Sequence, residues 1–307
     1  MKKTILFFCA IVLGVGACLG GHLFYLYFHQ QFEPKDFRHE FVFSNNSSTL
    51  VPDQVLKKQA SDILNQRFFY VGHGHQMTAF ESEDHRYVLK LFNPRPALNP
   101  EAFQSVRGMK HMCSLKWISH AYLKRASLIK QLAASYKIAF EELKAETGLV
   151  YIHLDDSTCL SKAVYLSPKK GAREWLQLDK VPFILQAKAE IAADRLGQLI
   201  RENRIEEAKT ALANLYAFFD ARARKGITDR QQTLYNNYGF IGDRVVQIDV
   251  GRIRKDENIQ KMPGAEIKRV FGHINKFLSA KYPQLSPFFW KLLPILSRGN
   301  YLSTKKS

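Results

Sequence analysis

The sequence predicts an α+β fold of two lobes, with a small antiparallel sheet first and a reduced helical lobe after it. Three observations predict this. Short segments with strand character dominate residues 67–92. Long segments with helical spacing dominate from residue 188 onward. A two-strand hairpin with polar ends, at 238–249, is embedded among those helices. Strands followed by helices are typical of an α+β architecture.

The composition permits a folded core and indicates acidic partners. Of 307 residues, 46% are hydrophobic and 24% are charged, and the formal net charge is +17. Such an excess favours nucleic acid, an anionic membrane surface or phosphorylated ligands. We expect no nucleic-acid partner, because the sequence has no zinc-finger spacing and no RNA-binding aromatic signature. The four cysteines form no C-x-x-C pair, so neither a zinc site nor a disulfide framework is indicated.

Residues 1–29 predict a transmembrane anchor or a signal segment. Residues 4–28 contain no Asp, Glu, Lys or Arg, and roughly 20 apolar residues suffice to cross a bilayer as a helix. Two alternatives stay open: a cleaved signal peptide, and a bacterial lipoprotein lipidated at Cys18, because residues 15–18 resemble a lipobox. We therefore expect a bacterial-type, single-pass membrane protein. The side of the membrane that holds the large domain stays open.

The first half of the remaining chain contains a linker and then strands. Residues 30–65 are predicted to form a stalk or linker that ends in a short helix. Period-two alternation predicts strands, which we place at 67–72, 77–82, 86–92, 148–154, 162–167 and 182–187. A helix is predicted over 113–146, and residues 93–127 are expected to be an insertion. Residues 66–190 form the predicted first lobe.

The second half predicts helices around the hairpin. Helical spacing covers 187–203 and 204–226, and the last helix is predicted over 264–282. Residues 191–285 form the predicted second lobe. Residues 286–307 are an apolar and basic tail, expected to pack on the domain or to lie on a membrane surface.

A glycine turn and a lysine mark the early strands. Gly72 and Gly74 lie between two strands, where glycine lets the backbone approach a phosphate closely. Lys90 shares one face of its strand with Val88 and Phe92. A lysine at such a place can neutralise nucleotide phosphates when a carboxylate orients it.

The stretch from 227 to 253 contains the polar residues that phosphoryl transfer needs. Asp229 follows a long helix, Asn237 precedes one strand of the hairpin, and Asp249 follows the other. Phosphoryl transfer needs a carboxylate near the attacking hydroxyl and oxygen ligands for Mg²⁺. Turn and cap chemistry is the alternative interpretation of each residue alone.

In this order the motifs resemble those of the protein-kinase-like superfamily. Gly72 and Gly74 resemble the glycine-rich loop, Val88-Leu89-Lys90 the strand-three lysine, and residues 226–229 the catalytic loop. Asn237 resembles the metal-binding asparagine, and Asp249-Val250-Gly251 the D-F-G element. The resemblance implies a membrane-anchored divergent phosphotransferase that uses ATP and Mg²⁺. It implies that Lys90 contacts phosphates, Asp229 handles the acceptor proton, and Asn237 and Asp249 hold the metal.

The resemblance also implies roles for three further groups. A helix glutamate should orient Lys90, and we assign Glu142 to this role. Residues 183–187 should form the last strand and the hinge that meets the adenine. Arg222, Arg224, Lys225 and Arg230 form a basic patch beside Asp229, which is either a solvated helix end or the site of an acidic acceptor.

Departures from the family pattern keep two alternatives open. No histidine precedes Asp229, and Val250 replaces the aromatic residue after Asp249. Asn237 comes eight residues after Asp229, where kinases have about five. A catalytically inactive pseudokinase or scaffold is the first alternative. A membrane-tethered basic module that binds anionic lipid is the second.

Overall fold

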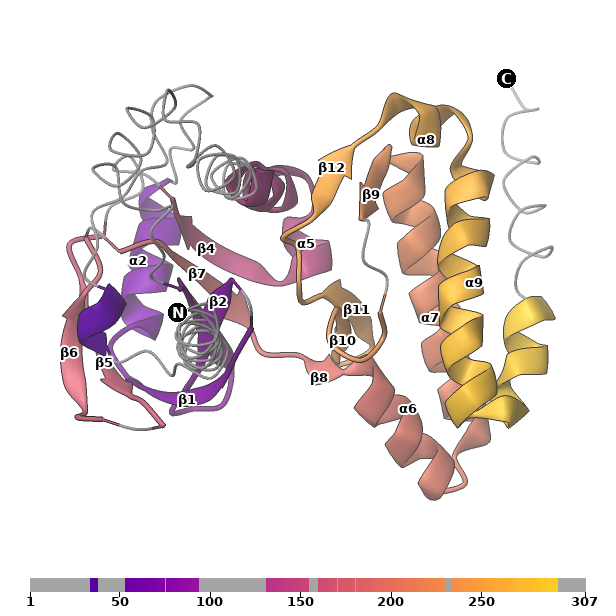
Figure 1. Ribbon diagram of the computed structural model, residues 1–307, viewed down its shortest axis with the longest axis horizontal. Helices are drawn as coiled ribbons and strands as arrows, with labels where there is room; N and C mark the ends of the chain where they lie inside the picture. Colours follow the sequence, from indigo (N-terminus) through magenta and orange to yellow (C-terminus); the bar gives the residue numbers. More distant parts are fainter. Residues whose placement is uncertain are drawn as a thin grey trace, which may run out of the picture.

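The computed structural model describes residues 34–37, 53–74, 76–93, 131–154, 160–169, 171–179, 181–229 and 233–291. These residues form a mixed α+β structure (Figure 1). A curled sheet with helix α2 (Gln54–Ile63) lies on one side, and helices α6 (Ala192–Arg201), α7 (Ile205–Arg224) and α9 (Pro263–Lys281) lie on the other. The predicted α+β class is therefore confirmed.

The main sheet has seven strands in the order β4-β7-β3-β2-β1-β5-β6. Their bounds are β1 Arg67–His73, β2 Met77–Ser82, β3 Tyr87–Phe92, β4 Leu149–His153, β5 Ala163–Ser167, β6 Glu174–Gln177 and β7 Phe183–Ala187. The meander β1-β2-β3 is antiparallel, as its sequence predicts. Each of the six strands predicted before residue 190 is present to within one residue or two.

The sheet is larger than the sequence predicts, because a second hairpin extends it. Strand β5 pairs with β1 in parallel, and the short β6 pairs with β5 in antiparallel fashion. The sequence did not predict β6. Only one of its four residues is buried, so its alternation is too short to give a strand signal.

Helix α2 packs on the sheet and has a polar cap. The side chain of Asp53 accepts a hydrogen bond of 2.7 Å from the amide of Leu56, which satisfies one free N–H of the first turn. The helix buries Ala60 and Ile63. Its partners come from the core of the sheet and include Phe68, Phe80, Leu89, Tyr151, Leu166 and Leu185. The short helix η1 (Pro34–Phe37) places Phe37 in the same core.

Residues 131–142, here called helix 131–142, cover the end of the sheet nearer the helical part. The short helix α5 (Lys144–Thr147) follows and leads into β4. Helix 131–142 buries Leu132, Tyr136 and Ala139 together with Ile184 of β7 and Val250. A single apolar cluster therefore joins residues of the sheet to the segment that follows the hairpin.

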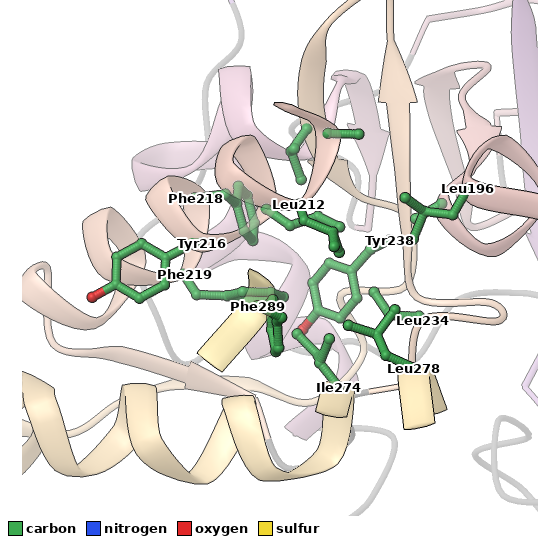
Figure 2. Close-up of a cluster of buried hydrophobic side chains, with 14 of the residues drawn as sticks. Leu196, Leu212, Tyr216, Phe218, Phe219, Leu234, Tyr238, Ile274, Leu278 and Phe289 are labelled. Carbon is green, nitrogen blue, oxygen red and sulfur yellow. The ribbon is translucent and has the colours of Figure 1, made fainter. Parts of the chain in front are cut away.

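The second part of the chain is built on α6, α7 and α9. Between these helices lie β8 (Glu190–Ile191), β9 (Ile227–Asp229), β10 (Tyr238–Ile241), β11 (Arg244–Gln247), β12 (Ile253–Lys255), α8 (Glu257–Lys261) and η6 (Pro283–Leu285). Figure 2 shows its core, where Leu212 and Phe219 of α7 meet Ile274 and Leu278 of α9 around Tyr238. All these side chains are buried.

Two small sheets position the polar residues of this part. Strands β10 and β11 form the predicted hairpin, and β10 also pairs with β8. Strand β11 ends at Gln247, so Asp249 lies two residues beyond it. Strands β9 and β12 pair in antiparallel fashion, which sets Asp229 opposite Ile253.

Several predictions lie outside the described residues. They include the anchor at 1–29, the insertion over most of 93–127, and the tail beyond residue 291. Among the described residues, no helix is long and apolar enough to span a bilayer.

Candidate functional site

Lys90 links the two parts of the chain. Its strand, β3, lies between β2 and β7 in the sheet. Its amine donates a hydrogen bond of 2.7 Å to the carbonyl of Ile248, which follows β11. Burial lowers the pKa of Lys90 from its ordinary value to about 8, although the nearby charge of Asp249 acts in the opposite direction. The lysine thus lies near enough to Asp249 to interact with its charge.

Ile248 also holds Asn237. The amide of Ile248 donates a hydrogen bond of 2.8 Å to the carbonyl of Asn237. The side-chain oxygen of Asn237 accepts from the hydroxyl of Thr233 at 3.3 Å. Because Lys90 binds the carbonyl of the same residue, the structure brings Lys90, Asn237 and Asp249 together around Ile248.

Asp249 and Gly251 form a tight turn after the hairpin. One carboxylate oxygen of Asp249 accepts from the amide of Gly251 at 3.1 Å, and its carbonyl accepts from the side chain of Gln247 at 2.9 Å. A Cβ added at Gly251 would lie 2.6 Å from the side chain of Leu132. A side chain there would therefore force Leu132 to shift.

The glycine turn is held from the end of β3. The amide of Gly74 donates to the carbonyl of Met77 at 2.8 Å. The buried side chain of Asn93 donates to the carbonyl of Gly74 at 3.0 Å and accepts from the hydroxyl of Thr78 at 2.7 Å. A Cβ at Gly72 would meet nothing within 4 Å, so packing does not require glycine there. Both backbone groups of Gly74 are thus hydrogen-bonded.

The helix group that faces the site is a tyrosine. The hydroxyl of Tyr136 donates to the sulfur of Met77 at 3.2 Å. Burial and the charge of Asp249 raise the pKa of Tyr136 well above its ordinary value, so the hydroxyl stays protonated.

The predicted pairing of Glu142 with Lys90 is not the arrangement in the structure. Glu142 forms an ion pair with Lys255 of β12. Ser135 lies two helical turns earlier on the same face and donates to the carbonyl of Ile253, also in β12, at 2.5 Å. This face of helix 131–142 therefore meets β12, while Tyr136 contacts Met77 at the start of β2.

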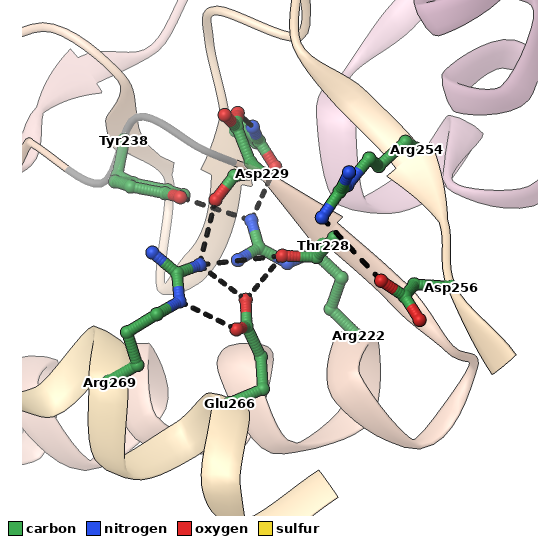
Figure 3. Close-up of polar contacts among 9 residues, drawn as sticks. Arg222, Thr228, Asp229, Tyr238, Arg254, Asp256, Glu266 and Arg269 are labelled. Atoms are coloured by element: carbon green, nitrogen blue, oxygen red, sulfur yellow. Dashed lines mark hydrogen bonds and ion pairs between the residues drawn. The ribbon is translucent and has the colours of Figure 1, made fainter. Parts of the chain in front are cut away.

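Asp229 lies inside a polar network, shown in Figure 3. It is 1% exposed. One carboxylate oxygen accepts from the side chain of Gln247, and its carbonyl accepts from Arg269 at 2.9 Å. Arg269 also pairs with Glu266, which accepts from Thr228 at 2.6 Å. Asp229 thus fixes the start of the loop before β10.

The predicted basic patch is smaller than expected. Arg222 is 2% exposed and donates to the hydroxyl of Tyr238 at 3.0 Å and to Gln247 at 2.8 Å. Arg224 pairs with Asp220, and Lys225 pairs with Glu146. Arg230 lies outside the described residues. Arg222 therefore supports the fold and does not belong to a surface.

Four contributors to this region were missed in the sequence: Gln76, Asn93, Tyr136 and Gln247. The positions of two of these residues in the sequence could have identified them. Asn93 directly follows the strand of Lys90, and Gln247 lies two residues before Asp249. Tyr136 and Gln76 become recognisable only when the helix and the turn are placed against the residues that follow β11.

Two oxygen-bearing side chains at the ends of the hairpin are the candidates for holding a divalent cation. In the described part of the chain, no group of three or more His, Cys, Asp or Glu side chains could hold a metal ion. However, Mg²⁺ that is bound with a nucleotide needs only one or two carboxylates beside phosphate and water. Asp249 and Asn237, at the two ends of the hairpin, supply a carboxylate and an amide oxygen.

Comparisons with known proteins give no family. No protein-family model matches the sequence, and no curated protein matches it. Among solved structures, the chain is similar to Rv3197 from Mycobacterium tuberculosis in complex with erythromycin, at 15% identity and a TM-score of 0.32. That alignment covers 76% of this chain and 60% of the other.

A second similar structure is the bifunctional kinase-methyltransferase WbdD. The identity is 13% and the TM-score 0.29, over 71% of this chain and 42% of WbdD. The chain thus spans less than two thirds of either protein. Similarity at this level carries no conclusion about function, which rests on the geometry of the chain itself.

Proposed function

We propose that this chain is a divergent kinase-like phosphotransferase that binds ATP with Mg²⁺ between the sheet and the β10–β11 hairpin. The arrangement around Ile248 carries the proposal. Its carbonyl accepts from Lys90 and its amide donates to Asn237, and the next residue is Asp249. A lysine for the phosphates, with an aspartate and an asparagine for the metal, is the set that kinase-like sites use.

The order of elements supports the same proposal. The sheet that contains the glycine turn and Lys90 comes first, and β7 then leads directly to β8 and the helices. Helix 131–142 packs beside β7, and the hairpin that contains the polar residues follows helix α7. The order of these elements supports the proposal.

The side chains have separate roles in this proposal. Asp249 and Asn237 would hold Mg²⁺, whose charge offsets that of the phosphates. Lys90 binds the phosphates from the side of the sheet. Its pKa of about 8 leaves most of it protonated at neutral pH.

A nucleotide-binding pseudokinase is the second candidate, and one observation favours it. The carboxylate of Asp229 is buried and accepts from Gln247, an arrangement typical of a structural residue. A general base has to reach the hydroxyl that it deprotonates. Binding of Mg·ATP is therefore better supported than transfer of the phosphoryl group.

The membrane anchor and the acceptor remain proposals. Residues 1–29 would attach the domain to a membrane, and the net charge of +17 suits an acidic acceptor or anionic lipid. If the chain were only a basic membrane-binding module, its binding to vesicles would be salt-sensitive and would survive loss of Asp249.

The proposal is tested by binding of Mg·ATP to the full chain and to Asp249→Ala. Asp243→Ala is the matched control, because Asp243 lies in the turn of the same hairpin, is 90% exposed and pairs with Arg195. Binding that is lost in Asp249→Ala and kept in Asp243→Ala supports the site. Equal affinity of both variants rejects it.

A further inference from the structure

A cavity of about 340 Å³ lies at the β5–β6 end of the sheet. It is lined by Asn65, Gln66, Arg67, Glu83, Tyr165 and Trp175. Strand β6 is the edge strand at this end, and β2 separates β1 from the strand of Lys90. Figure 1 shows β5 and β6 at the left of the molecule and the β10–β11 hairpin near its middle. The cavity is therefore separate from the site around Ile248.

Three side chains form a row across the strands that line the cavity. Trp175 of β6 is the register partner of Tyr165 in β5, and Tyr165 is the register partner of Arg67 in β1. Directly paired residues point to the same face of a sheet, so all three lie on one face. The rings of Tyr165 and Trp175 meet edge to face, with centroids 5.4 Å apart. Trp175 is 62% exposed, so its indole is open to a ligand.

The polar side chains of the cavity are held in place by hydrogen bonds. The guanidinium of Arg67 donates to both carboxylate oxygens of Glu83, at 3.1 Å each. The side chain of Gln66 donates to the carbonyl of Ile63 at 3.1 Å and accepts from the amide of Asp84 at 2.9 Å. Because these bonds orient the side chains in advance, less conformational entropy is lost when a ligand binds.

The charges that line the cavity cancel. Arg67 and Glu83 form an ion pair, and the other four lining side chains are two amides and two aromatic rings. A phosphate group would meet a cation that Glu83 already neutralises, and a cationic ligand would meet Arg67. A guanidinium has five N–H donors, and Glu83 engages those of two nitrogen atoms, Nε and Nη2. The cavity therefore favours a neutral ligand that accepts hydrogen bonds.

A sugar ring has the chemistry that matches these walls. The face of an aromatic ring is electron-rich, so it attracts the C–H groups on one face of a pyranose. The hydroxyl groups of the sugar both donate and accept, as the guanidinium of Arg67 and the amides of Asn65 and Gln66 require. A nucleobase also stacks on an exposed indole, but single-stranded nucleic acid needs a positively charged groove for its backbone. The ion pair in this cavity does not supply one.

We propose that the cavity beside Trp175 is a binding site for a neutral saccharide, with one sugar ring stacked on the indole and its hydroxyl groups bonded to Arg67 and Gln66. The volume of about 340 Å³ is near the lower limit of small-molecule sites, about 300–1,000 Å³, and so suits a short saccharide. The inference goes beyond the proposed function and does not depend on it.

The test is ¹⁹F NMR of the full chain labelled with 5-fluorotryptophan, in a buffer and detergent that contain no sugar. The chain has three tryptophans, and Trp175→Phe and Trp290→Phe assign two of the resonances. The probes are maltose, cellobiose and N,N′-diacetylchitobiose. At least one of them should shift the Trp175 resonance in a saturable way. The Trp290 resonance should not move, although Trp290 is also exposed, at 48%.

Arg67→Ala should weaken the affinity for that disaccharide about tenfold, because it removes charged hydrogen-bond donors. Arg204→Ala is the matched control, since Arg204 forms a similar exposed ion pair with Glu207. It should bind the disaccharide as the wild type does. Thermal unfolding shows that each variant folds, which we expect because both arginines are exposed.

Each of three results would overturn the inference. The first is the absence of a saturable shift of the Trp175 resonance with all three disaccharides. The second is an equal affinity of Arg67→Ala and Arg204→Ala. The third is a shift of the Trp175 resonance with AMP and none with the disaccharides, which would indicate a nucleobase site. The test contains no Mg·ATP, so its failure leaves the proposed function as it stands.

Discussion

The amine of Lys90 donates a 2.7 Å hydrogen bond to the carbonyl of Ile248, across 158 positions of sequence. This bond joins β3, an inner strand of the sheet, to the residue after the hairpin. It also sets the lysine beside Asp249, whose charge favours the protonated amine. Lys90 is thus oriented by the hairpin and not by a glutamate of helix 131–142.

Glu142→Ala should therefore leave the affinity for Mg·ATP unchanged. Glu142 pairs with Lys255, and the two side chains are 32% and 61% exposed. Loss of such a surface pair should lower the free energy of unfolding by less than about 1 kcal/mol. Calorimetry and urea unfolding measure the two effects.

Glu146→Ala is the matched control, since Glu146 forms a similar surface pair with Lys225. A tenfold loss of nucleotide affinity in Glu142→Ala, but not in Glu146→Ala, would restore Glu142 as the partner of Lys90.

Much of the fold could be predicted because its signals are local. The strands of the meander alternate over six or seven residues, and α7 and α9 have long apolar faces. Strands β8, β9 and β12 have two or three residues each. Such short strands form only because they pair with distant segments, so no local pattern of hydrophobic residues predicts them.

The proximity of some candidate residues was predictable from the sequence. The residue types and their order indicated Lys90, Asn237 and Asp249, and the structure brings these three together. The partner of Lys90 was not predictable, because it is a backbone carbonyl that any residue supplies. The setting of Asp229 depends on Gln247 and Arg269, which contact it only in the folded chain.

Asp229→Ala should destabilise the protein by about 1–3 kcal/mol, because it leaves the buried side chain of Gln247 without this acceptor. Asp229→Asn keeps an oxygen there and should lose less stability. If Asp229 is the base of a phosphotransferase, Asp229→Asn should also lower the transfer rate about 100-fold or more while Mg·ATP still binds.

The measurements are urea unfolding, calorimetry and release of ADP. An unchanged rate of transfer in Asp229→Asn would contradict a role as base. A wild type that binds Mg·ATP and releases no ADP would favour the pseudokinase.

Glu266 should make the stability depend on pH in the acid range. Burial disfavours its charged form, but hydrogen bonds from Arg269 and Thr228 and the charges of Arg269 and Arg222 outweigh this and lower its pKa. A carboxylate with a lowered folded-state pKa stabilises the fold above its unfolded pKa, and this contribution disappears as the pH falls through the folded value.

Glu266→Gln should thus lower the free energy of unfolding at pH 7 by about 2 kcal/mol. This value is smaller than for a fully buried ion pair, because Arg269 is 38% exposed. The difference from the wild type should shrink as the pH falls below about 4. Urea unfolding at both pH values measures it. The exposed Glu206 pairs with Lys209 on α7, so Glu206→Gln is a control that should show little difference at either pH. If the free energy of unfolding of Glu266→Gln were below that of the wild type by the same amount at both pH values, the charge of Glu266 would not be the cause of the stabilisation.

Calorimetric titration of Mg·ATP into the wild type, Asp249→Ala and Asp243→Ala tests the central claim most directly. We expect saturable binding by the wild type and by Asp243→Ala, and a loss of affinity of at least about tenfold in Asp249→Ala. Equal affinity in all three proteins, or no binding by the wild type, would contradict the proposed nucleotide site.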